Sequence, residues 1–165
     1  MSSIATFYLL PETGRAEFLS AHRNQKSVTH KRAFFGTKEV VTGERFLWEY
    51  LDTAATQRTA FPMSGFVIVD YLFTFVALPE PLVSALNEGA EDDPYYVITA
   101  ELATSLAQFL GAHVPSLEAL SAFAEESTPD PTGEYAQALL KTHDLLLDWF
   151  SRIPAGTFGV LHLTF

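Results

Sequence analysis

The chain contains no cysteine in its 165 residues. Disulfide bonds, zinc sites with thiolate ligands and cysteine nucleophiles are therefore excluded. Lysine and arginine are also scarce, with 10 residues against 20 aspartates and glutamates, which gives a formal net charge of −10. A protein with this charge repels nucleic acid and anionic lipid, so we expect neither as a partner.

Long apolar runs are missing as well. The most apolar stretch, residues 65–79, is interrupted by Asp70 and closed by Pro79. The uncharged runs of about ten residues on either side of Asp70 fall short of the roughly 20 that a helix needs to cross a bilayer. The opening residues, MSSIATFYLLPE, have no basic region ahead of the apolar ones, unlike a secretory signal. We therefore predict a soluble, cytoplasmic protein.

The basic residues that do occur are concentrated at one end of the chain. Residues 1–58 hold eight Lys and Arg against six Asp and Glu, whereas residues 59–165 hold two against fourteen. Between Arg58 and Lys141 there are twelve carboxylates and no basic residue. Such a field speeds encounter with a cationic protein, although solubility alone is an equal explanation.

The rest of the composition is that of a globular domain, with 48% apolar and 18% charged residues. A chain of this length most simply forms one domain with its own core. Branched and aromatic residues predict a β-strand over residues 3–10, and residues 156–165 predict an interior strand that we expect beside it.

Helices are predicted where apolar residues recur with helical spacing and suitable caps stand at the ends. Residues 25–43 are predicted to be largely irregular, with one hairpin. Residues 64–77 are apolar on every side, so they form either a central strand or a buried helix, and Asp70 needs a partner in both. The predicted helices cover residues 11–24, 44–55 (capped by Thr42), 81–88, 99–111 (capped by Thr99), 117–126 (capped by Ser116) and 133–152. The fold class is therefore α+β, a single domain with a small sheet that includes both terminal strands.

Four segments together resemble the YfbM-like bacterial domains. PYYVITAELATSLAQFL is similar to their tyrosine-bearing strand and threonine-started helix, and LLLDWFSRIPAGTFGVLHLTF to their closing helix, glycine turn and strand. MSSIATFYLLPE and RFLWEYLDTAA are similar to their opening strand and tryptophan-bearing helix. The resemblance covers about half of the chain and implies a compact α+β domain, without an established chemistry.

A dense group of carboxylates precedes two tyrosines near the middle of the chain. The acids do not alternate as calcium ligands do in a binding loop, so we expect no metal there. Tyrosine beside carboxylate suits the binding of lysine and arginine. The predicted partner-binding residues are Glu88, Glu91, Asp92, Asp93, Tyr95 and Tyr96, and a solvated loop is the alternative.

Catalytic signatures are absent from the sequence. The nucleophile elbow, the phosphate-binding loops and the HExxH zinc motif are all missing, and we expect no cofactor. His143, followed by Asp144 and Asp148, forms an alternative catalytic group, but its apolar neighbours on the last helix favour a buried structural histidine. His162, in an apolar strand, has the same interpretation.

The cluster His30, Lys31 and Arg32 stands close to Phe34 and Phe35, a combination that also occurs where proteins bind nucleic acid. The overall negative charge opposes that function, so we favour a local salt-bridged patch.

Our leading interpretation is a small bacterial protein that binds a basic protein, most concretely an immunity protein that neutralises a cationic toxin. The alternative is a small-molecule enzyme that uses carboxylates and a histidine in a cleft. The sequence does not determine the oligomeric state.

Overall fold

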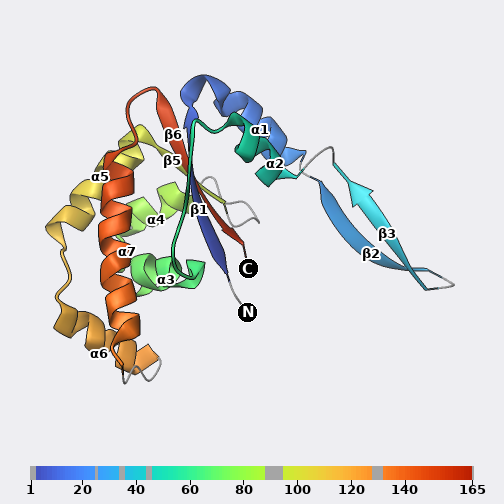
Figure 1. Cartoon of the computed structure of the whole chain (residues 1–165). Coiled ribbons are helices and arrows are strands. Elements are labelled where there is room, and N and C mark those ends of the chain that lie inside the picture. Colours follow the sequence, from blue (N-terminus) through green and yellow to red (C-terminus); the bar gives the residue numbers. More distant parts are fainter. Residues whose placement is uncertain are drawn as a thin grey trace.

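A computed structural model describes residues 3–24, 26–33, 36–43, 46–87, 95–127 and 132–164. Its centre is a four-stranded antiparallel sheet with the strand order β4-β1-β6-β5. Helices pack against this sheet, which confirms the predicted α+β fold class (Figure 1). The strands are β1 (Ile4–Pro11), β4 (Gln57–Ala60), β5 (Tyr95–Thr99) and β6 (Thr157–Thr164).

The two terminal strands lie side by side, as predicted. Their register runs from Ile4 opposite Thr164 to Pro11 opposite Thr157. β6 also pairs with β5, so it has neighbours on both edges. Its side chains are buried on both faces of the sheet, which explains why its sequence is apolar without a polar alternation.

One face of the sheet carries most of the helices (Figure 1). The longest of them, α7 (Glu134–Ser151), packs against α3, α5 and α6. The main hydrophobic core lies here, between these helices and inward-facing residues of the sheet such as Phe7, Leu161 and Leu163. The other helices on this side are α3 (Gly65–Val69), α4 (Glu80–Asn87), α5 (Ala100–Ala112) and α6 (Leu117–Ser127).

The opposite face carries a smaller core beneath α1 (Arg15–Arg23) and α2 (Leu47–Ala54). The one-turn 3₁₀ helix η1 (Glu12–Gly14) joins β1 to α1. Phe18 and Leu51 are fully buried against this face of the sheet. The two helices cover only part of it, because Ile4 at the start of β1 is 61% exposed.

The apolar segment that fitted either a strand or a helix is helical. α3 begins after Ser64, whose hydroxyl oxygen accepts the N–H of Phe66 at 3.4 Å. It continues as a π-helix, η2 (Asp70–Phe75). The partner expected for Asp70 is Tyr135 of α7, whose hydroxyl donates to the carboxylate at 2.5 Å. The segment is apolar on most sides because it contributes to the main core and packs against α7.

Two of the three predicted helix caps are confirmed. The Thr99 hydroxyl accepts the N–H of Leu102 at 3.2 Å, and the Ser116 hydroxyl accepts that of Ala119 at 3.1 Å. The prediction for Thr42 was wrong, since this residue ends a strand. α2 begins after Phe46 instead, whose N–H donates to the Glu49 carboxylate at 3.2 Å.

The hairpin predicted within residues 25–43 is confirmed, and it occupies most of the segment that was expected to be irregular. Its strands are β2 (Ser27–Ala33) and β3 (Gly36–Thr42), which pair along their whole length. Figure 1 shows this hairpin projecting away from the body of the molecule. Within the described ranges, no helix is both long and apolar enough to cross a membrane.

Gly159 of β6 lets the sheet approach α7 closely. A Cβ atom at this position would lie 2.7 Å from Ile153 Cδ1 and 3.0 Å from the Trp149 ring. We expect Gly159→Ala to lower the free energy of unfolding by about 1–3 kcal/mol through overpacking, as measured by urea denaturation.

Gly111 of α5 provides the control, because a Cβ there meets nothing within 4 Å. Gly111→Ala should leave stability unchanged or raise it by about 0.5–1 kcal/mol, since alanine favours a helix. Equal effects of the two substitutions would contradict the close approach at Gly159.

Candidate functional site

An open cavity of about 310 Å³ lies on the part of the sheet that α1 and α2 leave uncovered. Its volume is at the lower end of the roughly 300–1,000 Å³ typical of ligand pockets. We call it the open-face cavity. It is lined by Ile4, Thr6, Tyr8, Trp48, Asp52, Arg58, His162 and Thr164.

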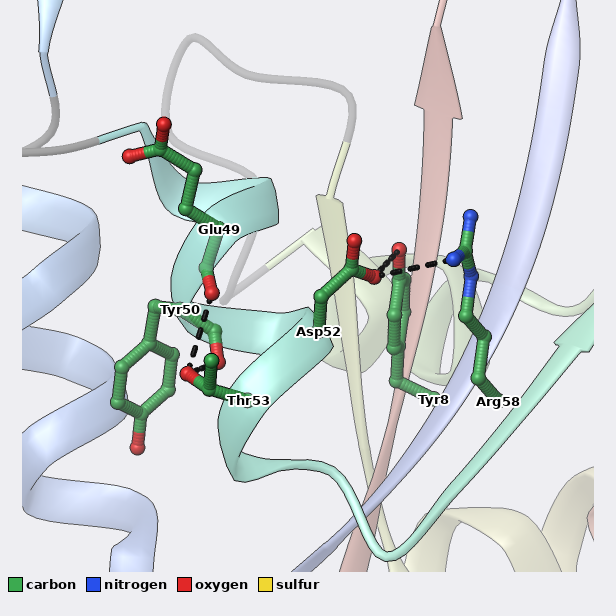
Figure 2. A network of polar contacts seen from close by, with 6 residues as sticks. All are labelled: Tyr8, Glu49, Tyr50, Asp52, Thr53 and Arg58. Atoms are coloured by element: carbon green, nitrogen blue, oxygen red, sulfur yellow. Dashed lines mark hydrogen bonds and ion pairs between the residues drawn. The ribbon is translucent and has the colours of Figure 1, made fainter.

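Three elements bring a tyrosine, a carboxylate and a guanidinium together in this cavity (Figure 2). The register of β1 and β4 places Arg58 directly opposite Tyr8. Asp52 reaches them from α2: its Oδ1 accepts the Tyr8 hydroxyl at 3.3 Å and lies 3.4 Å from Nη1 of Arg58. The Arg58 guanidinium also lies 5.9 Å from the centroid of the Tyr8 ring.

The position of α2 follows from its amphipathic sequence. Tyr50 and Leu51 are buried beneath the helix, and the Tyr50 hydroxyl donates to the Gly14 carbonyl at 3.4 Å. Trp48 and Asp52, four residues apart, share another side of the helix. That side borders the cavity, because both residues line it.

The ion pair between Asp52 and Arg58 is incomplete. The Arg58 side chain is 58% exposed, and its distance of 3.4 Å from Asp52 is long for a charge-assisted hydrogen bond. Asp52 is 33% exposed, and within the described part of the chain its Oδ2 has no hydrogen-bond or ion-pair partner. A carboxylate oxygen is therefore available to a second cation.

Two titratable groups that line the cavity, Tyr8 and His162, are uncharged near neutral pH. Burial, reinforced by the charge of Asp52, raises the pKa of Tyr8, so its hydroxyl stays protonated and donates to the carboxylate. Burial lowers the pKa of His162 to about 4, against a smaller opposite effect of Asp52. His162 stacks on Tyr95, with ring centroids 4.1 Å apart and an interplanar angle of 8°.

The rim of the cavity is aromatic and apolar. Trp48 is 47% exposed and stacks on Phe46, with ring centroids 6.0 Å apart. An exposed indole face next to a carboxylate can hold a cation by charge pairing and cation–π attraction. Catalysis fits less well, because an imidazole with a pKa near 4 is a weak general base at neutral pH.

The predicted partner-binding tyrosines lie on opposite faces of β5. Tyr95 is 5% exposed and belongs to the smaller core. Tyr96 packs against the main core beside Phe73, with ring centroids 6.0 Å apart. The two rings therefore do not form one exposed surface, because successive residues of a strand alternate between its faces. The predicted acids Glu88, Glu91, Asp92 and Asp93 lie outside the described residues.

The three residues of the alternative catalytic group, His143, Asp144 and Asp148, do not face one common site. His143 is 1% exposed, and its Nδ1 lies 2.5 Å from the Tyr71 hydroxyl. Burial lowers its pKa, opposed in part by Asp144. Asp144 and Asp148 are exposed, and Asp148 forms an ion pair with Arg152 at 2.5 Å. A helix turns by about 100° per residue, which directs the histidine inward and the carboxylates outward.

A second depression lies between β4 and α7, with a volume of about 60 Å³. This volume is well below the roughly 300–1,000 Å³ typical of ligand pockets, and the depression is bordered by the Asp148–Arg152 pair. In the part of the chain that the structure describes, no three His, Asp or Glu side chains gather closely enough to hold a metal ion.

The sequence interpretation missed Tyr8, Trp48, Asp52 and Arg58 as a group. One signal was present, because Arg58 is the last basic residue before the long acidic interval. Its register opposite Tyr8 and its pairing with Asp52 depend on tertiary structure.

The hydrogen bond between Tyr71 and His143 provides a test of a structural role for the histidine. Tyr71→Phe leaves the buried Nδ1 without its partner and should lower the free energy of unfolding by about 1–3 kcal/mol. In a double-mutant cycle with His143→Leu, the double variant should lose less stability than the sum of the single variants. Strict additivity would contradict the coupling.

The low pKa of His162 predicts a contribution to pH-dependent stability. The unfolded chain binds the proton near pH 6.5 and the folded chain only near pH 4. The stability that the buried, neutral His162 contributes is therefore fully present above pH 6.5 and decreases as the pH falls towards 4. Thermal denaturation across this range should show a weaker pH dependence for His162→Gln than for the unchanged protein. An NMR titration of the imidazole with a midpoint near 6.5 would contradict the prediction.

Comparisons with known proteins return no relative. No family model matches the chain, no curated protein matches it, and no solved structure matches its fold. The resemblance to the YfbM-like domains accordingly stays an expectation, and function is argued from the geometry of the site.

Proposed function

We propose that the protein binds a basic partner protein, and that Tyr8, Trp48 and Asp52 accept a lysine or arginine side chain of that partner. The observation that carries this proposal is the position of Arg58. Its guanidinium lies over the Tyr8 ring and beside the Asp52 carboxylate, so the cavity already holds a cation of this kind.

An incoming cation has three sources of attraction in the cavity. Asp52 Oδ2 can accept a charge-assisted hydrogen bond, which is about twice as strong as a neutral one. The exposed face of Trp48 adds cation–π attraction, which is strongest for tryptophan. Arg58 is exposed and its ion pair with Asp52 is long, so its guanidinium can move aside or remain as a neighbour.

The overall charge supports the same kind of partner. The acidic interval after Arg58 contributes exposed carboxylates along α4 to α7, among them Glu80, Glu101, Glu118 and Glu134. A field of this sign increases the rate of association with a basic protein, whereas buried contacts at an anchor slow dissociation. The predicted acids at positions 88–93 would add to this field.

The most concrete form of the proposal is a bacterial cytoplasmic immunity protein that neutralises a cationic toxin. In that form, the acidic surface attracts the toxin and the open-face cavity holds one of its basic side chains. The carboxylates of α4 to α7 lie across the sheet from the cavity, so they act on the rate of association through the long-range field.

Binding of a synthetic arginine-rich peptide, measured by calorimetry, tests the cavity directly. We expect Trp48→Ala and Asp52→Asn each to weaken binding by about tenfold or more, as hot-spot residues do. Arg58→Gln should strengthen binding, because it removes the competing internal cation.

The matched control is Glu118→Gln, which changes the net charge as much as Asp52→Asn does but lies on exposed α6. If both changes weaken binding equally, the peptide responds to overall charge and the cavity is not its site.

The physiological partner can be sought with the purified protein as bait in a lysate of its host, at low and high salt. We expect a basic protein that Asp52→Asn releases. The double variant Asp92→Lys/Asp93→Lys tests the predicted acidic rim separately. Retention of the same partner by all three proteins would contradict the proposal.

A further inference from the structure

The β2–β3 hairpin, residues 26–43, lacks a packing surface of its own. In the described part of the chain, the extensive contacts of each strand are with the other strand. Figure 1 shows the pair standing clear of the sheet and helices. An isolated two-stranded hairpin is marginally stable in water, so a surface that covers it would stabilise it.

Two apolar side chains of the hairpin are exposed at paired positions. Val28 lies opposite Val41 in the register, and they are 38% and 48% exposed. Cross-strand pairs of branched residues contact each other on one face of a hairpin. The hairpin therefore offers a small apolar patch near its base.

The hairpin is also the basic part of an acidic molecule. Residues 26–43 contain four Lys and Arg and one Glu, a formal charge of +3, so the remainder of the chain carries −13. A second copy is therefore attractive to the hairpin through its net charge, and its cavity offers the Asp52 carboxylate beside Arg58.

The base of the hairpin lies close to the open-face cavity. Nζ of Lys26 lies 5.2 Å from the centroid of the Phe46 ring, which in turn stacks on Trp48 at the cavity rim. Each strand has seven residues, so the hairpin extends about 23 Å from this base. Figure 1 shows β2 and β3 running away from the body of the molecule, so the two strands do not cover the cavity beside their own base.

We propose that the protein forms a two-fold dimer in which the hairpin of each copy covers the open-face cavity of the other. Because hairpin base and cavity adjoin, a two-fold axis near α2 creates both contacts at once. Each cavity, with its carboxylate and exposed indole, then receives a cationic segment, and each hairpin gains a packing surface. This inference rests on the proposed function, because it assigns the same cavity a second copy as occupant when the basic partner is absent.

The consequence is competition between self-association and partner binding. A basic partner must displace a hairpin from the cavity that it enters. Occupation of both cavities by the partner would therefore dissociate the dimer, with complexes of one copy and one partner as the product.

Sedimentation equilibrium with two complementary variants tests the exchange. Lys31→Glu/Lys38→Glu reverses charge at two paired positions of the hairpin and keeps the cavity. Trp48→Ala/Asp52→Asn alters the cavity and keeps the hairpin. We expect the unchanged protein to form dimers that weaken at high salt, and each variant alone to be monomeric. A mixture of the two variants should form a heterodimer, because one of the two contacts is intact. The Glu118→Gln variant should dimerise like the unchanged protein, and circular dichroism checks that all variants are folded.

Three outcomes would overturn the inference: a monomeric unchanged protein at every concentration, a dimer indifferent to the hairpin variant, or no heterodimer in the mixture. Titration of the hairpin variant with the arginine-rich peptide tests the proposed function separately, since that variant keeps the cavity. Peptide binding without self-association would remove the dimer and leave the proposed function in place. Self-association with no peptide binding would instead count against the proposed function.

Discussion

The structure depends on the pairing of β6 between β1 and β5. This strand is buried on both faces, so each face needs its own layer of helices. Phe158 and Val160 pack under α1 and α2, whereas Leu161 and Leu163 face the larger helical layer. Because the first and last strands of the described chain meet at this position, the elements between them are arranged around the sheet that these strands form.

The two helical layers are unequal, and the candidate site is a result of that difference. The layer that contains α7 covers its face with a continuous core. The other layer consists of two short helices, which leave the end of the sheet with Ile4 and Thr164 uncovered. Polar residues of β1 and β6 at the uncovered end are therefore tolerated, and Asp52 at the edge of α2 can meet Tyr8 and Arg58. The binding chemistry thus arises where packing is incomplete.

The sequence predicted the fold better than the site, for a physical reason. Periodicity and caps are local, so the terminal strands and the caps Thr99 and Ser116 could be predicted from neighbouring residues. The prediction of Thr42 as a helix cap was wrong because a capping residue is equally acceptable at the end of a strand. The segment 64–77 was ambiguous because burial on most sides removes the periodicity that distinguishes a helix from a strand. The site joins residues of three elements, with Asp52 separated from Tyr8 by 44 positions, and no local pattern reports such a contact. Tyr95 and Tyr96 do not share one exposed surface, because alternation on β5 directs them to opposite cores.

The placement of the two tryptophans has an optical consequence. Trp149 lies in the larger helical layer, with its ring centroid 4.1 Å from that of Phe7 and its edge close to Gly159. Trp48 lies on the other side of the sheet and is half exposed at the cavity rim. These are the only tryptophans in the chain. The molecule therefore carries one intrinsic fluorophore on each face of the sheet: one senses the packing of the core and the other the solvent at the cavity.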